Sequence, residues 1–167
     1  MMVSFLSANK QNRAAFFSIL LIIFTAACSD KPDDPRHQIK ILIDQVEAAA
    51  EKSSVKSFSE HVSEQYKDKY HDNRQQAMRS VLGYFHRNRN IHLFTRISSI
   101  EINEQVPGSA KASVNVAMTG TQVDSAEQLL LLKASIYRFD LDLRKEDDQW
   151  MISSAAWQRI QAREFLD

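Results

Sequence analysis

The feature that most constrains the fold is a change in the spacing of apolar residues near the middle of the chain. From Ile39 to Phe85, apolar side chains recur every three or four positions, which is the period of an α-helix. From Ile91 to Ile160 they mostly alternate with polar residues, which is the period of a strand with one buried face. Because helices come first and strands follow, the sequence predicts an α+β domain.

Three amphipathic helices are predicted, over residues 35–52, 55–66 and 73–87. The first begins with Asp34, whose side chain can cap it, and Pro35, whose missing N–H costs nothing in the first turn. Ser57 with Glu60 predicts a capping box for the second helix. Asp72 is the expected cap of the third helix.

Four long antiparallel strands are expected over about residues 91–102, 110–119, 130–143 and 150–160. The apolar parity changes near Ser98 and again near Ser135, and each change predicts a β-bulge or a strong bend. Pro107 and Gly108 predict a turn between the first two strands, and the acidic residues 146–148 predict the turn before the last strand. Bulged strands of this kind form a strongly curved sheet, and we expect the three helices to pack on its concave face.

The N-terminal segment has the layout of an export signal that ends at the chain's single cysteine, Cys28. Lys10 and Arg13 precede an apolar run over residues 14–27, two alanines stand directly before the cysteine, and no acidic residue occurs ahead of it. This pattern resembles a bacterial lipoprotein signal peptide, whose cleavage exposes a cysteine that is then acylated. An ordinary secretory signal and an uncleaved anchor stay open as alternatives, although 14 residues are fewer than the roughly 20 that a spanning helix needs.

The resemblance implies a lipid-anchored protein of the bacterial cell envelope, with a signal peptide over residues 1–27 and a tether over residues 28–36. Two prolines and three aspartates among residues 29–36 are typical of an extended linker. Ser29, rather than aspartate, follows the cysteine, which in lipoproteins favours the periplasmic face of the outer membrane. The implied partner is the lipid bilayer, reached through palmitate and other acyl chains on Cys28.

The charge balance argues against a nucleic-acid partner. The chain has 21 basic and 21 acidic residues, and two of the basic residues lie in the leader, so the remainder carries 19 basic and 21 acidic residues, a formal charge of −2. The three glycines lie far apart, so the sequence has no glycine-rich phosphate loop. One cysteine and histidines without zinc-ligand spacing predict no metal site, and we expect no cofactor.

Residues 37–161 are predicted to form three helices followed by four long strands, and the closing segment 149–157 lies near their end. This order resembles the nuclear transport factor 2-like (SnoaL-like) superfamily, a cystatin-type α+β fold. That resemblance implies a cone between sheet and helices, either packed or open at one end, and a minor strand pair near residues 65–71. Residues 162–167 would form a C-terminal tail. The superfamily includes isomerases, dehydratases, transport adaptors and nonenzymatic modules, so the fold does not fix the function.

Aromatic side chains are the main candidates for ligand contact, because a small-molecule pocket is mostly apolar. We expect most of them to be core residues; the candidates are Tyr66, Tyr70, Phe85, Tyr137, Phe139 and Trp157. The predicted function is a nonenzymatic module that binds a small apolar ligand or an envelope protein through the cone or the sheet face. A homodimer formed through the sheet is a further alternative.

The alternative function is that of a small cofactor-independent hydro-lyase or isomerase. His71 with Asp72 would supply its general base and the carboxylate that orients it, whereas in the simpler interpretation Asp72 caps a helix and His71 is solvated. Asp140 and Asp142 alternate with arginines, which favours a solvated sheet face with cross-strand ion pairs over acid–base chemistry. The basic connection over residues 86–90 is either a solvated loop or an anion site.

Overall fold

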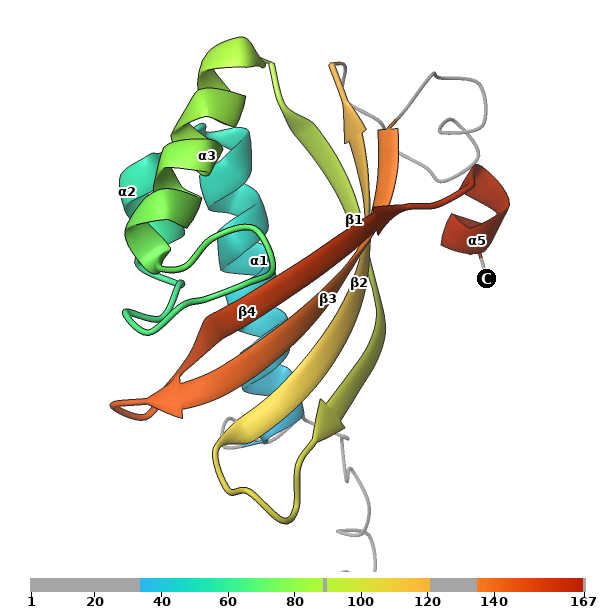
Figure 1. Ribbon diagram of the computed structural model, residues 1–167. Helices are drawn as coiled ribbons and strands as arrows, with labels where there is room; N and C mark the ends of the chain where they lie inside the picture. Colours follow the sequence, from blue (N-terminus) through green and yellow to red (C-terminus); the bar gives the residue numbers. More distant parts are fainter. Residues whose placement is uncertain (1–33, 89, 121–134, 167) are drawn as a thin grey trace, which may run out of the picture. The chain divides into compact units, whose positions relative to one another are not determined.

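The computed structural model describes residues 34–88, 90–120 and 135–166, which form a curved four-stranded antiparallel sheet with helices on both sides (Figure 1). The elements are α1 (Pro35–Glu51), α2 (Val55–Ser59), α3 (Arg74–Arg87), β1 (His92–Ile102), β2 (Ser109–Thr119), β3 (Ser135–Glu146), β4 (Gln149–Arg159) and α5 (Ala162–Leu166). The strands pair in chain order, with α1, α2 and α3 on one side of the sheet and α5 on the other (Figure 1). The predicted α+β class and order of elements are confirmed.

Helix α1 begins as predicted, and α2 begins at the predicted residue, Val55, but has a different cap and is shorter. Asp34 Oδ1 accepts a hydrogen bond of 3.0 Å from the Arg36 N–H, and Pro35 occupies the first turn. The cap of α2 is Ser54 rather than Ser57, and the helix ends at Ser59 instead of continuing to residue 66.

The chain leaves α2 early because the residues after it pair with β4. The Ser63 N–H donates to the Ile152 carbonyl, and the Ile152 N–H donates to the His61 carbonyl, both at 2.9 Å. Val62 therefore forms an isolated parallel bridge with Ile152. Residues 65–71 are not in a strand, so the predicted minor strand pair is wrong. The bridge to β4 lies slightly upstream, and within this stretch the Lys67 N–H donates to the Ser153 carbonyl at 3.2 Å.

Helix α3 matches the predicted range within a residue but has a different cap. Asn73 Oδ1 accepts a hydrogen bond of 3.0 Å from the Gln76 N–H. Gln76 Oε1 in turn accepts from the Asp72 N–H at 3.0 Å. The predicted cap at Asp72 is thus wrong by one residue. The Asn73 side chain caps the helix, whereas Asp72 contributes only its backbone N–H, which donates to the Gln76 side chain as in a capping box.

The sheet carries two bulges, one where it was predicted and one elsewhere. The register between β1 and β2 shifts between Ile97 and Ser99, which confirms the bulge predicted near Ser98. The second shift lies on β4, where Ser153 is the extra residue between the partners of Asp142 and Leu143. From Ser135 onward β3 pairs with β2 without a shift, so the described residues have no bulge there; predicted strand residues 130–134, on the other side of the predicted bulge, lie outside the described part of the chain.

Both predicted turns are confirmed. Gly108 adopts a φ of 75°, a left-handed conformation that glycine takes without the steric cost of a Cβ atom. Asp147 and Asp148 have φ values of 46° and 64°, as in the two-residue hairpin loops whose twist matches that of the flanking strands.

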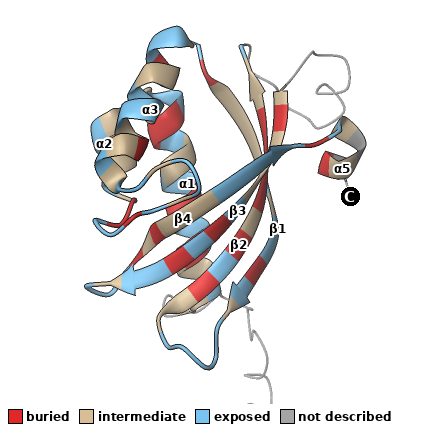
Figure 2. Cartoon of the chain, in the orientation of Figure 1, coloured by how far each residue is buried: buried red, intermediate tan, exposed pale blue. Residues whose placement is uncertain are grey.

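The main core lies between the helices and the sheet. Helix α1 contributes Ile39, Leu42 and Ile43, and the strands contribute residues such as Val114 and Leu143. Figure 2 shows buried positions alternating with exposed ones in the half of β3 that leads to its turn. No helix among the described residues is long and apolar enough to cross a membrane.

Residues 162–166 form α5 rather than the tail that the sequence led us to expect. Phe165 is 1% exposed and belongs to a small second core with Ala117 and Ile136 on the sheet face opposite α1. Its ring centroid lies 5.7 Å from that of Phe94. The Arg96 guanidinium donates a hydrogen bond of 2.9 Å to the Phe165 carbonyl, so α5 is held by both packing and polar contacts.

Candidate functional site

Four of the six aromatic candidates form a continuous row of ring contacts from the segment before α3 across β4 to β3. The Tyr70 and Trp157 ring centroids are 5.0 Å apart, those of Trp157 and Phe139 are 6.3 Å apart, and those of Phe139 and Tyr137 are 6.4 Å apart. Phe139 and Trp157 are also register partners on neighbouring strands. We call Tyr70, Trp157, Phe139 and Tyr137 the aromatic row.

The bulge on β4 is what places Trp157 in the aromatic row. In a regular strand Trp150 and Trp157 would face opposite sides of the sheet, because an odd number of positions separates them. The extra residue at Ser153 restores the parity, so both tryptophans pair with residues of the helix-facing side of β3. The odd spacing of the two tryptophans was the sequence signal for this bulge.

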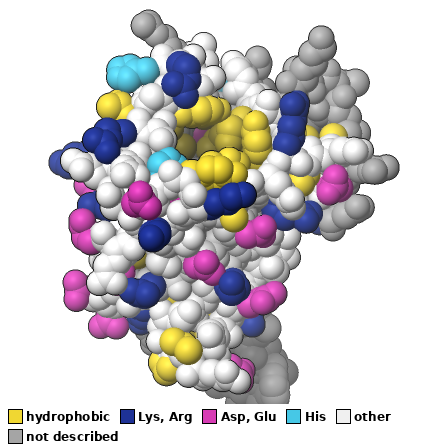
Figure 3. Space-filling view, viewed as in Figure 1, with side chains coloured by type: hydrophobic (Ala, Val, Ile, Leu, Met, Phe, Trp, Pro, Cys, Tyr) yellow, Lys and Arg dark blue, Asp and Glu magenta, His cyan; other side chains and the backbone are white. Residues whose placement is uncertain are grey.

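The aromatic row lies where the core opens to solvent. Tyr70 is 60% exposed and Trp157 is 38% exposed, whereas Leu143, on the same side of β3, is buried. Figure 3 shows hydrophobic side chains gathered around a hollow in this face, between the positions that α3 and β4 occupy in Figure 1. Contiguous exposed apolar surface of this kind is typical of a ligand or partner site.

Helix α3 contributes a tyrosine to the same region. The Tyr84 hydroxyl donates a hydrogen bond to the Met118 sulfur of β2 at 3.1 Å. Burial raises the pKa of Tyr84, and the neighbouring phenol of Tyr137 raises it further. Tyr84 therefore stays protonated at neutral pH and presents a neutral ring beside the aromatic row.

The remaining two candidates, Phe85 and Tyr66, are buried elsewhere and do not join the aromatic row. Phe85 packs edge-on against Phe58, with ring centroids 6.2 Å apart, in a small core beside the start of β1. Tyr66 is 7% exposed and belongs to the main core. Both were candidates by residue type alone, and their helical or loop positions turn them inward.

His71 lies next to the aromatic row in the chain, and its carboxylate partner is Asp68. The His71 Nδ1 atom is 2.8 Å from Asp68 Oδ2, and the Nε2 atom is 2.9 Å from the Ser80 hydroxyl oxygen on α3. The predicted partner, Asp72, is instead an exposed residue at the start of α3. Sequence reasoning missed Asp68 and Ser80; an aspartate three positions before a histidine in a turn-forming segment was the available signal for the first.

Asp68 is the most completely bonded carboxylate of this region. Its side chain is 1% exposed. It accepts hydrogen bonds from the Tyr66 hydroxyl at 2.5 Å and from the N–H groups of Tyr70 and His71 at 2.6 and 2.8 Å. Burial raises the pKa of Asp68, but the hydrogen bonds from Tyr66 and His71 outweigh it and hold that pKa below its usual value. Asp68 is therefore an ionised, fixed acceptor at neutral pH.

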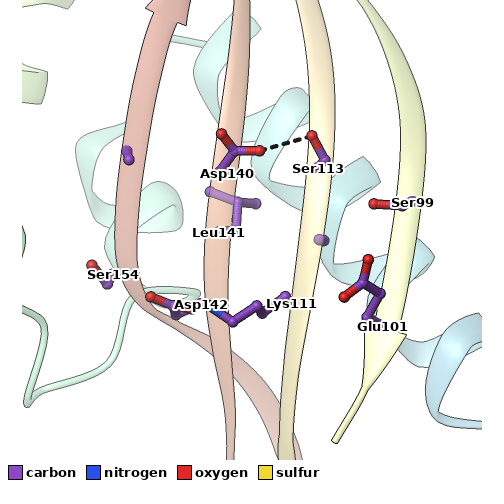
Figure 4. Close-up of a pocket in the computed structure, with 10 residues that line it drawn as sticks. Ser99, Glu101, Lys111, Ser113, Asp140, Leu141, Asp142 and Ser154 are labelled. Carbon is purple, nitrogen blue, oxygen red and sulfur yellow. Dashed lines mark hydrogen bonds and ion pairs between the residues drawn. The ribbon is translucent and has the colours of Figure 1, made fainter.

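The opposite face of the sheet carries a polar groove of about 390 Å³ (Figure 4). Lys111 Nζ lies 3.0 Å from Asp142 Oδ1, and the Ser113 hydroxyl donates to Asp140 Oδ1 at 2.8 Å. These pairs confirm the predicted solvated face with cross-strand contacts. Among the described residues, no cluster of three His, Cys, Asp or Glu side chains is suited to hold a metal ion.

Two predicted features lie wholly or partly outside the described residues. Cys28 and the leader fall in the segment 1–33, and residue 89 interrupts the basic connection over residues 86–90. Lipidation at Cys28 and anion binding at the connection stay predictions.

The fold resembles that of several solved structures, although no family model and no curated protein matches the sequence. A nuclear transport factor 2-like protein of unknown function from Shewanella baltica is 12% identical, with a TM-score of 0.53 over 75% of this chain and 94% of that chain. A Nostoc punctiforme domain of unknown function with a cystatin-like fold is 16% identical, with a TM-score of 0.57 over 78% and 82%. A Streptomyces avermitilis protein, named provisionally as a dehydratase of the nuclear transport factor 2-like family, is 12% identical, with a TM-score of 0.57 over 78% and 99%.

These likenesses identify the fold as the nuclear transport factor 2-like, cystatin-like α+β fold, as the sequence predicted. At such low identity they show the fold alone, and the function must be argued from the site.

Proposed function

We propose that the protein is a lipid-anchored module of the bacterial envelope that binds a small apolar ligand with one anionic group at the aromatic row. The observation that carries this proposal is the contact between Tyr70 and Trp157, two large rings held against each other while 60% and 38% exposed. Such rings offer a ligand apolar area without first having to be ordered.

The expected affinity follows from the apolar area that a ligand could cover. Burying about 200 Å² of apolar surface contributes about 5 kcal/mol at about 25 cal/mol per Å². A well-placed aromatic contact adds roughly 0.5–1.5 kcal/mol. The sum of about 5.5–6.5 kcal/mol corresponds to a dissociation constant between about 20 µM and 100 µM.

Cations at both ends of the aromatic row favour an anionic group on the ligand. Lys69 Nζ lies 5.6 Å from the centre of the Tyr70 ring. At the other end Arg159 is the register partner of Tyr137. A carboxylate, sulfonate or phosphate attached to an apolar body would lie close to one of these charges.

Two related dyes test this site. The anionic dye 1-anilinonaphthalene-8-sulfonate and the neutral N-phenyl-1-naphthylamine share the same apolar body, and both fluoresce when bound. We expect both to bind saturably, and Trp157→Ala to weaken both at least tenfold. Arg159→Ala should weaken only the anionic dye. Leu82→Ala, a change at a 44% exposed residue of α3, is the control and should alter neither.

Equal binding by the wild type and the Trp157→Ala protein would overturn this part of the proposal. Light scattering of the same samples measures the molar mass and so detects a second copy of the chain. If the protein has twice the monomer mass and does not bind the dyes, a homodimer covers the aromatic row instead.

The anchor is proposed from the leader alone. Acylation of Cys28 after removal of residues 1–27 would leave a short tether, and we place the domain at the periplasmic face of the outer membrane. Growth with labelled palmitate tests this: wild-type protein should carry the label and fractionate with membranes. Cys28→Ser should lose both properties, and unchanged processing and membrane retention of that variant would contradict the anchor.

A further inference from the structure

Three side chains from the segment before α3 and from α3 itself form one line of hydrogen bonds. Asp68 Oδ2 is 2.8 Å from His71 Nδ1, and His71 Nε2 is 2.9 Å from Ser80 Oγ. A carboxylate, an imidazole and a hydroxyl in this order are the arrangement by which unrelated enzymes activate a serine, and it is recognised by geometry rather than by position in the chain. We propose that Ser80 is the nucleophile of an ester-hydrolysing site in which His71 is the general base and Asp68 is the positioning residue.

The hydrogen bonds fix the direction in which a proton can move. An ionised Asp68 can only accept, so His71 Nδ1 carries the ring proton that faces it. In the neutral ring His71 Nε2 is then unprotonated and accepts from the Ser80 hydroxyl. This is the tautomer that a general base for Ser80 requires.

Asp68 is held more firmly than an ordinary surface carboxylate. Its side chain is 1% exposed and also accepts from the Tyr66 hydroxyl and from the backbone N–H of Tyr70. His71 is 16% exposed in its side chain, and Ser80 is an exposed residue, so a reagent can reach the hydroxyl from solvent. The orienting end is therefore rigid and the reacting end is open.

Ser80 lies on the side of α3 that borders the aromatic row. Residues spaced by three or four positions share one face of a helix, so Ser80 lies on the same face as Tyr84 and the buried Ala77. The Tyr84 hydroxyl on this face donates a hydrogen bond to the Met118 sulfur of β2. The apolar part of an ester whose carbonyl is at Ser80 can therefore extend toward the exposed rings.

A cation lies on the next turn of the same helix surface. Gly83 has no side chain, and a Cβ atom there would be 3.3 Å from Nη1 of Arg87, so the guanidinium lies back over Gly83 toward the turn that carries Ser80. We assign to Arg87 the stabilisation of the negative charge that develops on the ester oxygen.

The reaction balances without a further reagent. Ser80 Oγ bonds to the ester carbonyl carbon while its proton passes to His71 Nε2, and the carbonyl oxygen takes the negative charge. The carbonyl then re-forms, the bond to the alcohol oxygen breaks, and His71 returns the proton to that oxygen. A water molecule repeats both steps on the acylated serine, which gives the acid, the alcohol and free Ser80.

This activity goes beyond ligand binding and is tested separately from it. The dye titrations need no serine chemistry, so their outcome does not decide whether Ser80 is a nucleophile. In the same way, a failure of the serine test would leave the proposed ligand binding at the aromatic row unaffected. An alkyl fluorophosphonate is the probe, because it reacts with an activated serine and releases fluoride. The intact protein is incubated with it in detergent, and intact mass and peptide mapping locate the adduct.

We expect one adduct, on Ser80. Ser80→Ala and His71→Gln should abolish it, and Asp68→Asn should slow it at least a hundredfold with the Ser80 peptide still the one labelled. Ser59→Ala is the control and should label at the wild-type rate. Three outcomes would each overturn the proposal: an unlabelled wild-type protein, an adduct on another residue, or full labelling of a folded His71→Gln protein. The first two are measured on the wild-type protein, so they test the proposal even if a variant does not fold.

Discussion

Tyr70 and Trp157 hold their ring centroids 5.0 Å apart at a tilt of 44°, although most of the first ring and part of the second remain in contact with water. The pair connects the segment before α3 to β4. The Tyr70 N–H is bonded to Asp68 Oδ1 at 2.6 Å, so its backbone is fixed by the same carboxylate that contacts His71. An exposed aromatic surface that is already ordered loses little conformational freedom when it binds a ligand.

Tyr70→Ala should cost little stability and change the surroundings of Trp157. The lost ring is 60% exposed, so we expect the free energy of unfolding to fall by less than about 1 kcal/mol. Trp157 would become more solvated, and its fluorescence emission, measured in a Trp150→Phe background, should shift to longer wavelength. An unchanged emission maximum would mean that the two rings do not contact each other in solution.

Asp68→Asn should reduce stability at neutral pH and have less effect in acid. The pKa of Asp68 is below its usual value, so its contribution is present above the unfolded pKa of about 3.9 and is lost as the pH falls through the folded pKa. We expect a loss of about 1–3 kcal/mol at pH 7. Denaturant unfolding at pH 7, 5 and 3 measures it, with exposed Asp72→Asn as the control. A difference that is independent of pH would contradict an ionised, hydrogen-bonded Asp68.

Glu47→Gln should have the opposite effect from Asp68→Asn: it should raise the stability of the protein at neutral pH. Burial raises the pKa of Glu47, the hydrogen bond with Thr95 lowers it, and the charges of Glu51 and Asp44 raise it again. A raised carboxyl pKa means that full stability is present below the unfolded pKa of about 4.3 and that part is lost as the pH rises through the folded pKa.

Removing the charge of Glu47 should therefore stabilise the protein at pH 7 by less than about 1 kcal/mol, or a few degrees in Tm, because solvent screens a partly exposed group. The gain should vanish at pH 3. Exposed Glu60→Gln is the control, and a lower Tm for Glu47→Gln at pH 7 would show that the carboxylate is a net stabilising group.

Leu143→Ala tests the main core. Leu143 is 2% exposed and packs between α1 and the sheet, so we expect the free energy of unfolding to fall by about 2–5 kcal/mol. Leu82→Ala, at a 44% exposed position, should change it by less than about 0.5 kcal/mol. Equal losses in the two variants would contradict the assignment of the helix-facing side of β3 to the core.

The elements that local pattern predicted are those whose stability is local. Helices α1 and α3 have both apolar periodicity and polar caps, and both begin within a residue of the predicted position. Helix α2 was predicted too long because Val62 and Tyr66 continue its stripe, yet Val62 is buried through its bridge to Ile152 of β4. A contact between residues so far apart in the chain cannot be predicted from the local spacing of apolar residues. Helix α5 is too short to display a period.

The site was predictable by residue type and only partly by position. The aromatic candidates were identified, but which of them meet depends on the register of β3 with β4, and therefore on one extra residue at Ser153. In the same way His71 was identified, while its partners Asp68 and Ser80 depend on a turn and on the packing of that turn against α3. Local sequence does not fix either packing relationship.

Ligand contact at the aromatic row is the central claim, and the two tryptophans allow a direct test. Trp150→Phe leaves Trp157 as the single tryptophan, and Trp157→Phe leaves buried Trp150, whose indole N–H donates to Gln38 Oε1 at 3.1 Å. Each protein is titrated with dodecanoate, an apolar chain with one carboxylate, below the concentration at which it forms micelles. The account predicts a saturable blue shift of Trp157 emission and no shift of Trp150 emission. An unshifted Trp157 emission throughout the titration, or an equal shift of both tryptophans, would contradict it.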